Sequence, residues 1–245
     1  MADHDSCLVS KLSHYVNLSA ADKQLLANIE KTEQDFAADE LLYRSGDKIR
    51  NLYVVKTGWL IGYSHLPEGG RHITRFYHAG DILGLSTLAF SRFSTDVRAV
   101  NKAVLCPFPK SAFEKIFLQS PRLAALLFTL TSREQIILTD RLRATSSLKP
   151  SGRLAYLFLN TPDRLRITNS SMTITMNMPL TQQDLGDALG LTNVTVSRTL
   201  RAMEAKNLIK RGAGKLTLAD EERLIDLCDY ENRHQHLDTS WFPSS

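Results

Sequence analysis

Apolar residues in residues 181–205 recur at intervals of three to four, which is the spacing of two short amphipathic helices. The residues that mark the two buried faces are Leu185, Leu189, Val196, Leu200 and Met203. Thr181 and Thr192 are good N-cap residues ahead of the two segments, and Gly190 can adopt a positive φ at the break. The pattern therefore predicts a helix, a tight turn and a second helix.

Residues 36–108 show a different pattern, in which short β-rich runs alternate with turn residues. The runs cover residues 51–55, 59–63, 73–77, 97–100 and 103–108. Strands at this even spacing predict a double-stranded β-roll of the jelly-roll type. A helix is expected before the roll, starting at residues 18–22 and passing through Leu25, Leu26 and Ile29.

The longest helical pattern covers residues 111–146, and Pro121 is expected to start its main part as a first-turn proline. Four apolar residues at spacings of four, three and seven predict a seam for a parallel helix pair, namely Leu123, Leu127, Leu130 and Ile137. Glu134 interrupts this seam, and a helix that packs only on its own domain is the alternative. A hinge is expected at residues 148–152, where Pro150 and Gly152 end the helix.

The remaining segments complete an α+β chain. A helix at residues 153–160, two strands at 165–168 and 172–178 and a basic hairpin at 210–218 are expected to complete a winged helix-turn-helix. The expected organisation is a helix and sensor roll (1–110), a dimerisation helix (111–147), a winged helix-turn-helix (148–220) and an acidic extension (221–245). In the extension we expect a helix at 221–227 followed by an unstructured end.

Charge concentrates where the helix-turn-helix is predicted. The net charge is +4, but residues 148–215 hold ten lysines and arginines against four acidic residues. The second helix exposes polar and basic residues toward its N-terminal end, as a helix that enters the DNA major groove does. The chain shows neither an apolar run long enough to span a bilayer nor a secretory signal, so a cytoplasmic protein without membrane contact is expected.

The order of roll, long helix and winged helix resembles the CRP/FNR family of bacterial transcription regulators. The motifs that carry the resemblance are VKTG at residues 55–58, HAGDILG at 78–84, LGLT at 189–192 and VSR at 196–198. The resemblance implies a homodimer whose two recognition helices enter successive major grooves of a pseudo-palindrome in double-stranded DNA. It also implies RNA polymerase as a partner if the protein is an activator.

The resemblance further implies roles for residues in the helix-turn-helix, residues 181–200, and beyond it. The expected DNA-binding residues are Thr181, Gln182, Thr192, Asn193, Val194, Thr195, Ser197, Arg198, Arg201 and Lys215. Arg198 is expected to bind guanine O6 and N7, with a phosphate contact as the alternative. Ser197 is expected to form a hydrogen bond with a neighbouring base edge. The expected phosphate contacts are Arg201, Thr181, Gln182 and Lys215.

Val194 departs from the family pattern. Family members commonly carry Glu three residues before the Ser-Arg pair, where it accepts a hydrogen bond from cytosine N4. Valine cannot accept that bond, but it can pack on a thymine methyl group. We therefore expect a half-site of the family's TTGAT or TGTGA type with altered or relaxed preference at that base.

The residues argue against two effectors known in the family. An iron–sulfur cluster needs four cysteines per subunit, and this chain has Cys7, Cys106 and Cys228 only. Cyclic-nucleotide members use a Gly-Glu-Leu turn and an Arg before a small hydroxyl residue, and the aligned positions here lack both charged groups. Those positions, the candidate effector pocket, are Gly84, Leu85, Ser86, Phe93 and Ser94, with Arg92 displaced by one.

Other signals remain open. His72, His78 and Cys106 are available as haem ligands, but such residues in a roll more often serve packing or hydrogen bonding, which argues against haem. Three widely spaced cysteines without a CxxC pair suggest neither a zinc site nor a disulfide framework, and Cys106 is expected to be a buried apolar residue or a redox sensor. No cofactor or metal is identified, and an unknown small molecule or no ligand is the remaining hypothesis.

An enzyme built on the roll is the alternative class. A cupin-like metalloenzyme needs histidine and carboxylate ligands that converge inside the barrel, whereas the only His-x-His here, His234 to His236, lies in the acidic tail. No nucleophile–base signature such as G-x-S-x-G is present. The sequence therefore favours a DNA-binding regulator without catalytic residues.

Overall fold

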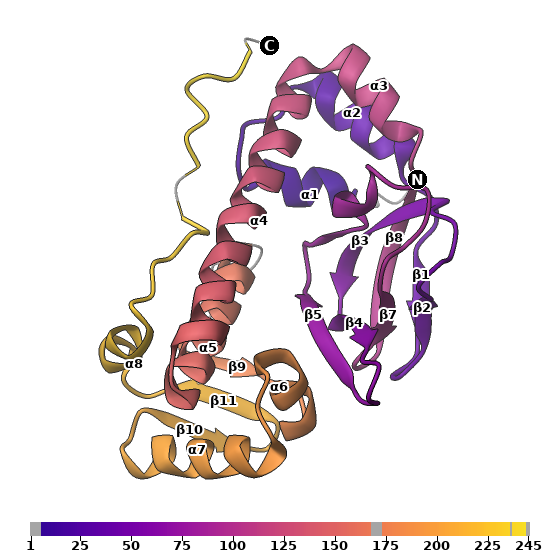
Figure 1. Cartoon of the computed structure of the whole chain (residues 1–245). Helices are drawn as coiled ribbons and strands as arrows, with labels where there is room; N and C mark the ends of the chain where they lie inside the picture. Colours follow the sequence, from indigo (N-terminus) through magenta and orange to yellow (C-terminus); the bar gives the residue numbers. More distant parts are fainter. Residues whose placement is uncertain (1–5, 168–172, 236, 244–245) are drawn as a thin grey trace. The chain divides into compact units, whose positions relative to one another are not determined.

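The computed structural model describes residues 6–167, 173–235 and 237–243, and it has the expected α+β fold. Its internal contacts divide the chain into two units. The first contains the described residues of 1–64, 76–134 and 236–245, and the second those of 65–75 and 135–235. The long helix is continuous through the division, as Figure 1 shows.

The helices are α1 (Cys7–Ser13), α2 (Ala20–Ile29), the 3₁₀ turn η1 (Leu85–Thr87), α3 (Ala112–Gln119), α4 (Pro121–Ser147), α5 (Pro150–Arg166), α6 (Gln182–Leu189), α7 (Asn193–Ala205) and α8 (Glu221–Cys228). The strands are β1 (Gln34–Phe36), β2 (Leu41–Tyr43), β3 (Asn51–Thr57), β4 (Leu60–His65), β5 (Arg71–Tyr77), β6 (Ile82–Leu83), β7 (Asp96–Ala99), β8 (Ala103–Pro109), β9 (Thr175–Asn177), β10 (Ile209–Gly212) and β11 (Lys215–Leu218).

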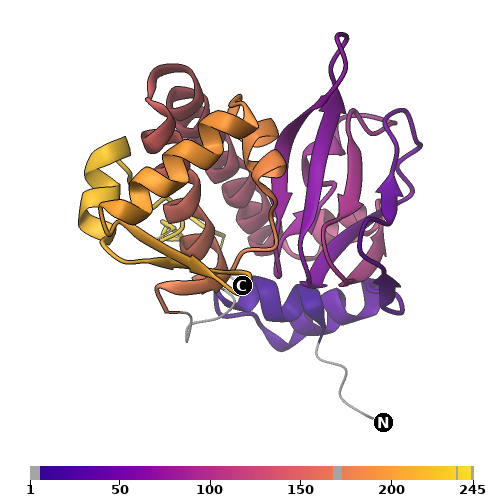
Figure 2. The same ribbon diagram turned by 90° about the horizontal axis from the view of Figure 1, so that it is seen from below.

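The β-roll consists of two four-stranded sheets that lie face to face (Figure 2). One sheet has the order β1-β8-β3-β6 and the other β2-β7-β4-β5. All five runs that the sequence predicted as strands are strands here, so that prediction is confirmed. Gly58 connects β3 to β4 at a φ of +90°, and a Cβ atom there would lie 2.6 Å from the Ala103 backbone, so only glycine fits this close turn.

Aromatic side chains occupy the interior of the roll. Phe93 stacks on Tyr43 with ring centroids 3.7 Å apart, and Tyr53 meets Tyr43 edge to face at 5.9 Å. The Tyr43 hydroxyl donates to the Asn51 carbonyl oxygen at 2.8 Å, and burial raises the pKa of this phenol. The interior around Tyr43 is therefore a packed aromatic core in which this hydroxyl has a hydrogen-bond partner.

A second core lies where α1, α2 and α3 meet the first half of α4. Its buried residues include Leu8, Leu12, Leu26, Phe113, Ile116, Leu123, Leu126, Leu127 and Leu130. Pro121 begins α4, as predicted. Three residues of the predicted dimer seam, Leu123, Leu127 and Leu130, are buried in this core, and Ile137 is buried further along α4. These four side chains pack within their own chain, so the prediction that they face a second copy is corrected.

Helix α5 runs further than its sequence predicted. Its expected end was near Asn160, and a strand was expected at residues 165–168, but α5 continues through Pro162 to Arg166. Residue 168 lies outside the described residues. The continuation is stabilised by a tertiary contact and by a contact within the helix, since Asp163 accepts from the Tyr230 hydroxyl at 2.8 Å and from Arg166, three residues later in α5, at 2.7 Å. These contacts compensate for the backbone donor that Pro162 lacks.

The start of α5 packs closely against α8. A Cβ atom on Gly152 would lie 2.7 Å from the Leu227 carbonyl oxygen, so glycine allows the two helices to approach. Leu224 and Cys228 on α8 are almost fully buried. The predicted helix at residues 221–227 is confirmed, and it forms part of the second unit.

The end of the chain is more ordered than expected. The His234 imidazole lies 2.9 Å from the Asn160 side-chain oxygen, and Arg233 forms an ion pair with Asp140 at 3.0 Å. Phe242 is buried in the core that contains Leu123 and Leu127. The expected unstructured end is therefore wrong at these residues. Within the described residues, no helix combines the length and apolarity that crossing a membrane requires.

Candidate nucleic-acid interface

Helix α6 starts with a complete capping box. The Thr181 hydroxyl oxygen accepts from the Asp184 backbone N–H at 3.1 Å, and the Asp184 carboxylate accepts from the Thr181 N–H at 2.8 Å. Two backbone donors that a helix N-terminus leaves unpaired are thereby satisfied. The cap anticipated from the sequence is present.

Two glycines and one arginine shape the turn that follows α6. Gly190 has a φ of +63° and its N–H donates to the Gly186 carbonyl, which ends the helix. A Cβ atom on Gly186 would lie 2.6 Å from the Leu191 carbonyl oxygen, so the chain can turn back only over glycine. The Arg153 guanidinium on α5 donates to the Leu189 carbonyl at 3.0 Å, which satisfies a free helix-end acceptor.

Helix α7 separates an apolar face from a polar one. Val196, Leu200 and Met203 are buried, as predicted. The Thr192 hydroxyl caps the helix by accepting from the Thr195 N–H at 3.2 Å. The opposite face is open to solvent, and the Val194 side chain on it is 66% exposed. Asn193 and Arg198 are also exposed, so exposed polar side chains lie beside Val194 in the first two turns of α7.

The predicted wing is a three-stranded sheet in the order β10-β11-β9. Its tip turns at Ala213 and Gly214, which both have positive φ. The Arg211 guanidinium binds the Glu204 carboxylate on α7 through two bonds of 3.0 and 2.8 Å, so the wing strand is tied to the helix. Lys210 and Lys215 remain exposed on the wing.

The predicted DNA-binding residues lie together at the surface of this unit. Thr181 and Gln182 are exposed at the start of α6, Arg198 and Arg201 are exposed on α7, and Lys215 is exposed on the wing. Within the described residues, Arg198 and Arg201 form no salt bridge, so their guanidinium groups are available to an anionic partner. Ser197 and Thr195 are half-buried on the same helix. Exposed donors of this kind suit the phosphates and base edges of a DNA groove.

Gln183, Arg153 and Glu204 are positioning residues that the sequence pattern does not identify. The Asn193 side chain donates to the Gln183 amide oxygen at 2.7 Å, which links α7 to α6. Arg153 and Glu204 hold the turn and the wing, respectively. A sequence pattern shows which residues share a helix face, but these contacts join separate elements, so no local signal marked them.

The candidate effector residues of the roll differ in burial. Phe93 is buried against Tyr43, and Leu85 packs against the core under α1. Ser86 and Ser94 are exposed, and the Arg92 guanidinium donates to the Gly46 carbonyl oxygen at 2.6 Å. Gly84 adopts a φ of +94° before η1. His78 is buried with its ring 4.2 Å from that of Trp59.

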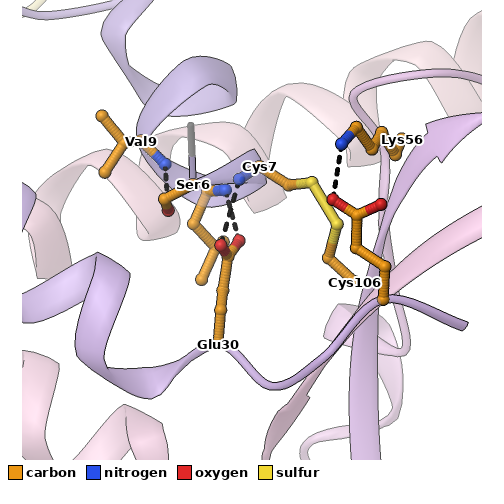
Figure 3. The surroundings of a disulfide bond; sticks show 8 residues. Ser6, Cys7, Val9, Glu30, Lys56 and Cys106 are labelled. Carbon is orange, nitrogen blue, oxygen red and sulfur yellow. Dashed lines mark hydrogen bonds and ion pairs between the residues drawn. A yellow bond between two sulfur atoms is a disulfide. The ribbon is translucent and has the colours of Figure 1, made fainter. Parts of the chain in front are cut away.

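Cys7 and Cys106 form a disulfide bond in the first unit (Figure 3). The sequence suggests no disulfide framework, because its three cysteines are widely spaced and include no CxxC pair. The fold brings together two cysteines that are 99 positions apart. Their Cα atoms are 6.6 Å apart, within the range that a disulfide spans. Cys228 is a buried free thiol.

Two family models match this chain over the two parts just described. Residues 33–120 match the cyclic nucleotide-binding domain, and residues 152–227 match the Crp-like helix-turn-helix domain. The first covers the roll and the second covers α5, the helix-turn-helix, the wing and α8. Both parts were therefore correctly recognised from sequence motifs.

Known proteins of similar sequence and fold are transcription regulators. The chain is 25% identical over 221 residues to the fumarate and nitrate reduction regulatory protein of Yersinia pestis. The aligned region covers 90% of this chain and 88% of the relative. It is 27% identical to FixK2 from Bradyrhizobium japonicum, with a TM-score of 0.71 over 80% of this chain and 96% of that one. A CRP-family regulator from Thermus thermophilus shares the fold at 17% identity, with a TM-score of 0.64 over 81% and 98% of the two chains.

Proposed function

Since the chain belongs to the CRP/FNR family of DNA-binding transcription regulators, we propose that it binds a pseudo-palindromic operator as a homodimer. The family consists of regulators rather than enzymes, so the metalloenzyme alternative is set aside. The observation that carries the proposal is the exposure of Arg198 and Arg201 on α7 and of Lys215 on the wing. The proposed site of action is the cytoplasm, where a bacterial operator is accessible.

We assign direct base reading to the first turns of α7. Arg198 is exposed, is free of salt bridges in the described part of the chain and lies one helical turn after Val194. A guanidinium in that position can donate two parallel hydrogen bonds to guanine O6 and N7. Arg201, Lys215 and the exposed start of α6 are assigned to phosphates, which fix the register without selecting sequence.

The proposed dimer surface is the exposed face of α4. Phe128, Leu138 and Leu142 are 67%, 62% and 65% exposed, and together with Gln135 they recur at spacings of seven, three and four. This is the heptad spacing of a helix pair. In a single chain these apolar side chains contact water, and a second copy of α4 would bury them.

We further propose that the signal sensed by the roll is not a cyclic nucleotide. Phe93 stands where relatives of the nucleotide-binding type place a phosphate-binding arginine, and it fills the interior by stacking on Tyr43. Ser86 replaces the acidic residue of the ribose turn and is exposed. Iron–sulfur and haem control are likewise not proposed, and the signal is another small molecule, a redox change or none.

A titration with DNA tests the proposed function. The purified chain is titrated against a labelled family-type pseudo-palindrome and a scrambled duplex at several salt concentrations. We expect selective binding to the palindrome, with an affinity that falls steeply with salt because bound phosphates release counterions. Equal affinity for both duplexes under every condition would contradict the proposal.

The Arg198→Ala variant tests the base-reading assignment. Loss of a bidentate base contact should weaken operator binding by about 1–3 kcal/mol and relax one base position of the half-site. Arg50→Ala is the matched control, because Arg50 is an exposed arginine of the first unit, outside the winged helix-turn-helix. Uniform weakening on all sequences would assign Arg198 to a phosphate instead.

A further inference from the structure

The disulfide between Cys7 and Cys106 joins the first residue of α1 to the middle of β8 (Figure 3). Both cysteines are buried, with 8% and 2% of their surfaces exposed. The bond is the sole covalent cross-link among the described residues, and it fastens a short segment near the N-terminus to the roll.

Helix α1 depends on tertiary contacts for its position. It has seven residues, and a helix of that length is not stable by itself in water. Leu8 and Leu12 are buried in the core, and the Glu30 carboxylate accepts from the N–H groups of Cys7 and Leu8 at 3.0 and 2.6 Å. The disulfide adds to a small set of attachments, so its loss changes how firmly α1 is held.

The same core supports the first half of α4. Cys7 and Cys106 belong to one buried cluster with Leu123, Leu126 and Leu130 of α4. The segment after α1 also reaches α4, because the Arg133 guanidinium donates to the Tyr15 hydroxyl at 3.3 Å and lies over the Tyr15 ring. Packed contacts therefore connect the segment that the disulfide holds to the first half of α4.

We propose that Cys7 and Cys106 form a reversible thiol–disulfide switch that controls how α1 supports the first half of α4. In a compartment where thiols are kept reduced, such a bond forms only when an oxidant is present. The consequence for DNA binding rests on the proposed function, because α4 is the helix proposed to join the two copies.

The oxidant of the closing reaction is hydrogen peroxide. One thiol attacks the peroxide, the O–O bond breaks, and a sulfenic acid and one water form. The second thiol then attacks the sulfenic sulfur, so that the S–S bond forms and a second water leaves. Two electrons pass from the sulfurs to the peroxide. A dithiol reductant opens the bond by two exchange steps and is itself oxidised to a disulfide.

Thiol counting across a redox series tests reversibility. The full-length protein is equilibrated in buffers of increasing ratio of reduced to oxidised glutathione, quenched in acid, alkylated and weighed as an intact chain. We expect two alkylation sites to appear together in one transition, with the same transition in Cys228→Ser and none in Cys7→Ser. An unchanged bond at every ratio, or glutathione attached to a single cysteine throughout, would overturn the proposal.

Sedimentation of the oxidised and reduced protein tests the coupling. We expect reduction to weaken self-association by about tenfold, within the roughly 5–150-fold range of typical coupling between sites. Cys7→Ser should behave like the reduced protein in both buffers, and Cys228→Ser should respond like the unmodified chain. Equal self-association in both states would overturn the coupling.

Two further readouts separate the possible failures. If neither redox form selects the palindrome over the scrambled duplex, the proposed function is wrong. Thiol counting and sedimentation would still show whether the disulfide is reversible and whether it controls self-association. Glu33 has a carboxylate oxygen within 4.8 Å of both sulfurs, so the reduced protein is also titrated with Zn²⁺. Stoichiometric zinc that persists in the redox series and prevents the bond from forming would overturn the redox switch.

Discussion

The position of Val194 on α7 predicts a specific change in the base preference of the half-site. Val194 is the second residue of α7 and its side chain is exposed. The capping Thr192 lies two residues before it and Arg198 four residues after it. An apolar group in this place contributes contact with a thymine methyl but leaves the amino group of a cytosine without an acceptor. The selectivity of the half-site is expected to be reduced at the base that Val194 faces.

Val194→Glu should introduce cytosine selectivity at that base. A glutamate carboxylate accepts from cytosine N4, and we expect about 1–3 kcal/mol of new discrimination at one position. Selection from randomised half-sites measures the change, with Val194→Ala as a control that removes the apolar contact without adding an acceptor. Full cytosine selectivity in the unmodified protein would contradict the assignment.

Cys228 should be unreactive in the native protein at neutral pH. Burial raises the pKa of its thiol to about 12, and its sulfur donates to the Leu224 carbonyl at 3.3 Å. Because only the thiolate reacts, alkylation should be slow at pH 8 and should accelerate about tenfold for each pH unit above it. Timed alkylation with mass analysis measures this rate, with the denatured chain as the control. If Cys228 in the folded protein reacted at the rate of a free thiol, the prediction that it is unreactive would be wrong.

At the level of elements, the helix-turn-helix is held by backbone geometry that only some residues allow. Gly190 supplies the left-handed conformation and Gly186 the close approach to Leu191. The Arg153 guanidinium donates a hydrogen bond to the Leu189 carbonyl at the end of α6. The turn and the adjacent helix α5 therefore set the angle between α6 and α7.

Gly186→Ala should destabilise the second unit. The added Cβ would lie 2.6 Å from the Leu191 carbonyl oxygen, so the turn must shift, at an expected cost of about 1–3 kcal/mol. Thermal unfolding should show a midpoint lowered by roughly 2–4 °C per kcal/mol. Gly212→Ala is the matched control in the same unit, because a Cβ there meets no atom within 4 Å. Equal midpoints for both variants would refute the steric argument.

At the scale of the whole molecule, α4 serves two roles with two faces. One apolar stripe, which includes Leu123 and Leu127, packs in the core of the chain itself. The other, which includes Phe128, Leu138 and Leu142, is exposed. The proposed homodimer would use the second stripe.

Leu142→Glu should weaken the proposed dimer. Each dimer would then bury two carboxylates without partners, and the dissociation constant should rise by roughly 100-fold or more. Sedimentation over a concentration series measures it, and operator affinity should fall in parallel. Leu118→Glu is the control, since Leu118 is an exposed leucine on α3 outside the α4 face. Equal loss in both variants would place the interface elsewhere.

The sequence by itself determined the local elements and the type of each unit. Caps at Thr181 and Thr192, a glycine at the break and the apolar spacing of α7 are local signals, and each acts within a few residues. The alternation of short β-rich runs likewise identified the roll. Motifs in both parts were sufficient for the family, because their residues lie close together in the chain.

Only the tertiary structure decided which residues meet across long separations. Both stripes of α4 have helical apolar spacing, so periodicity alone could not say which one the chain buries itself. The Cys7–Cys106 pair, the continuation of α5 through Pro162 and the burial of Phe242 depend on contacts with distant segments. A local pattern carries no information about such partners, since the free energy that selects them arises only when the core is assembled.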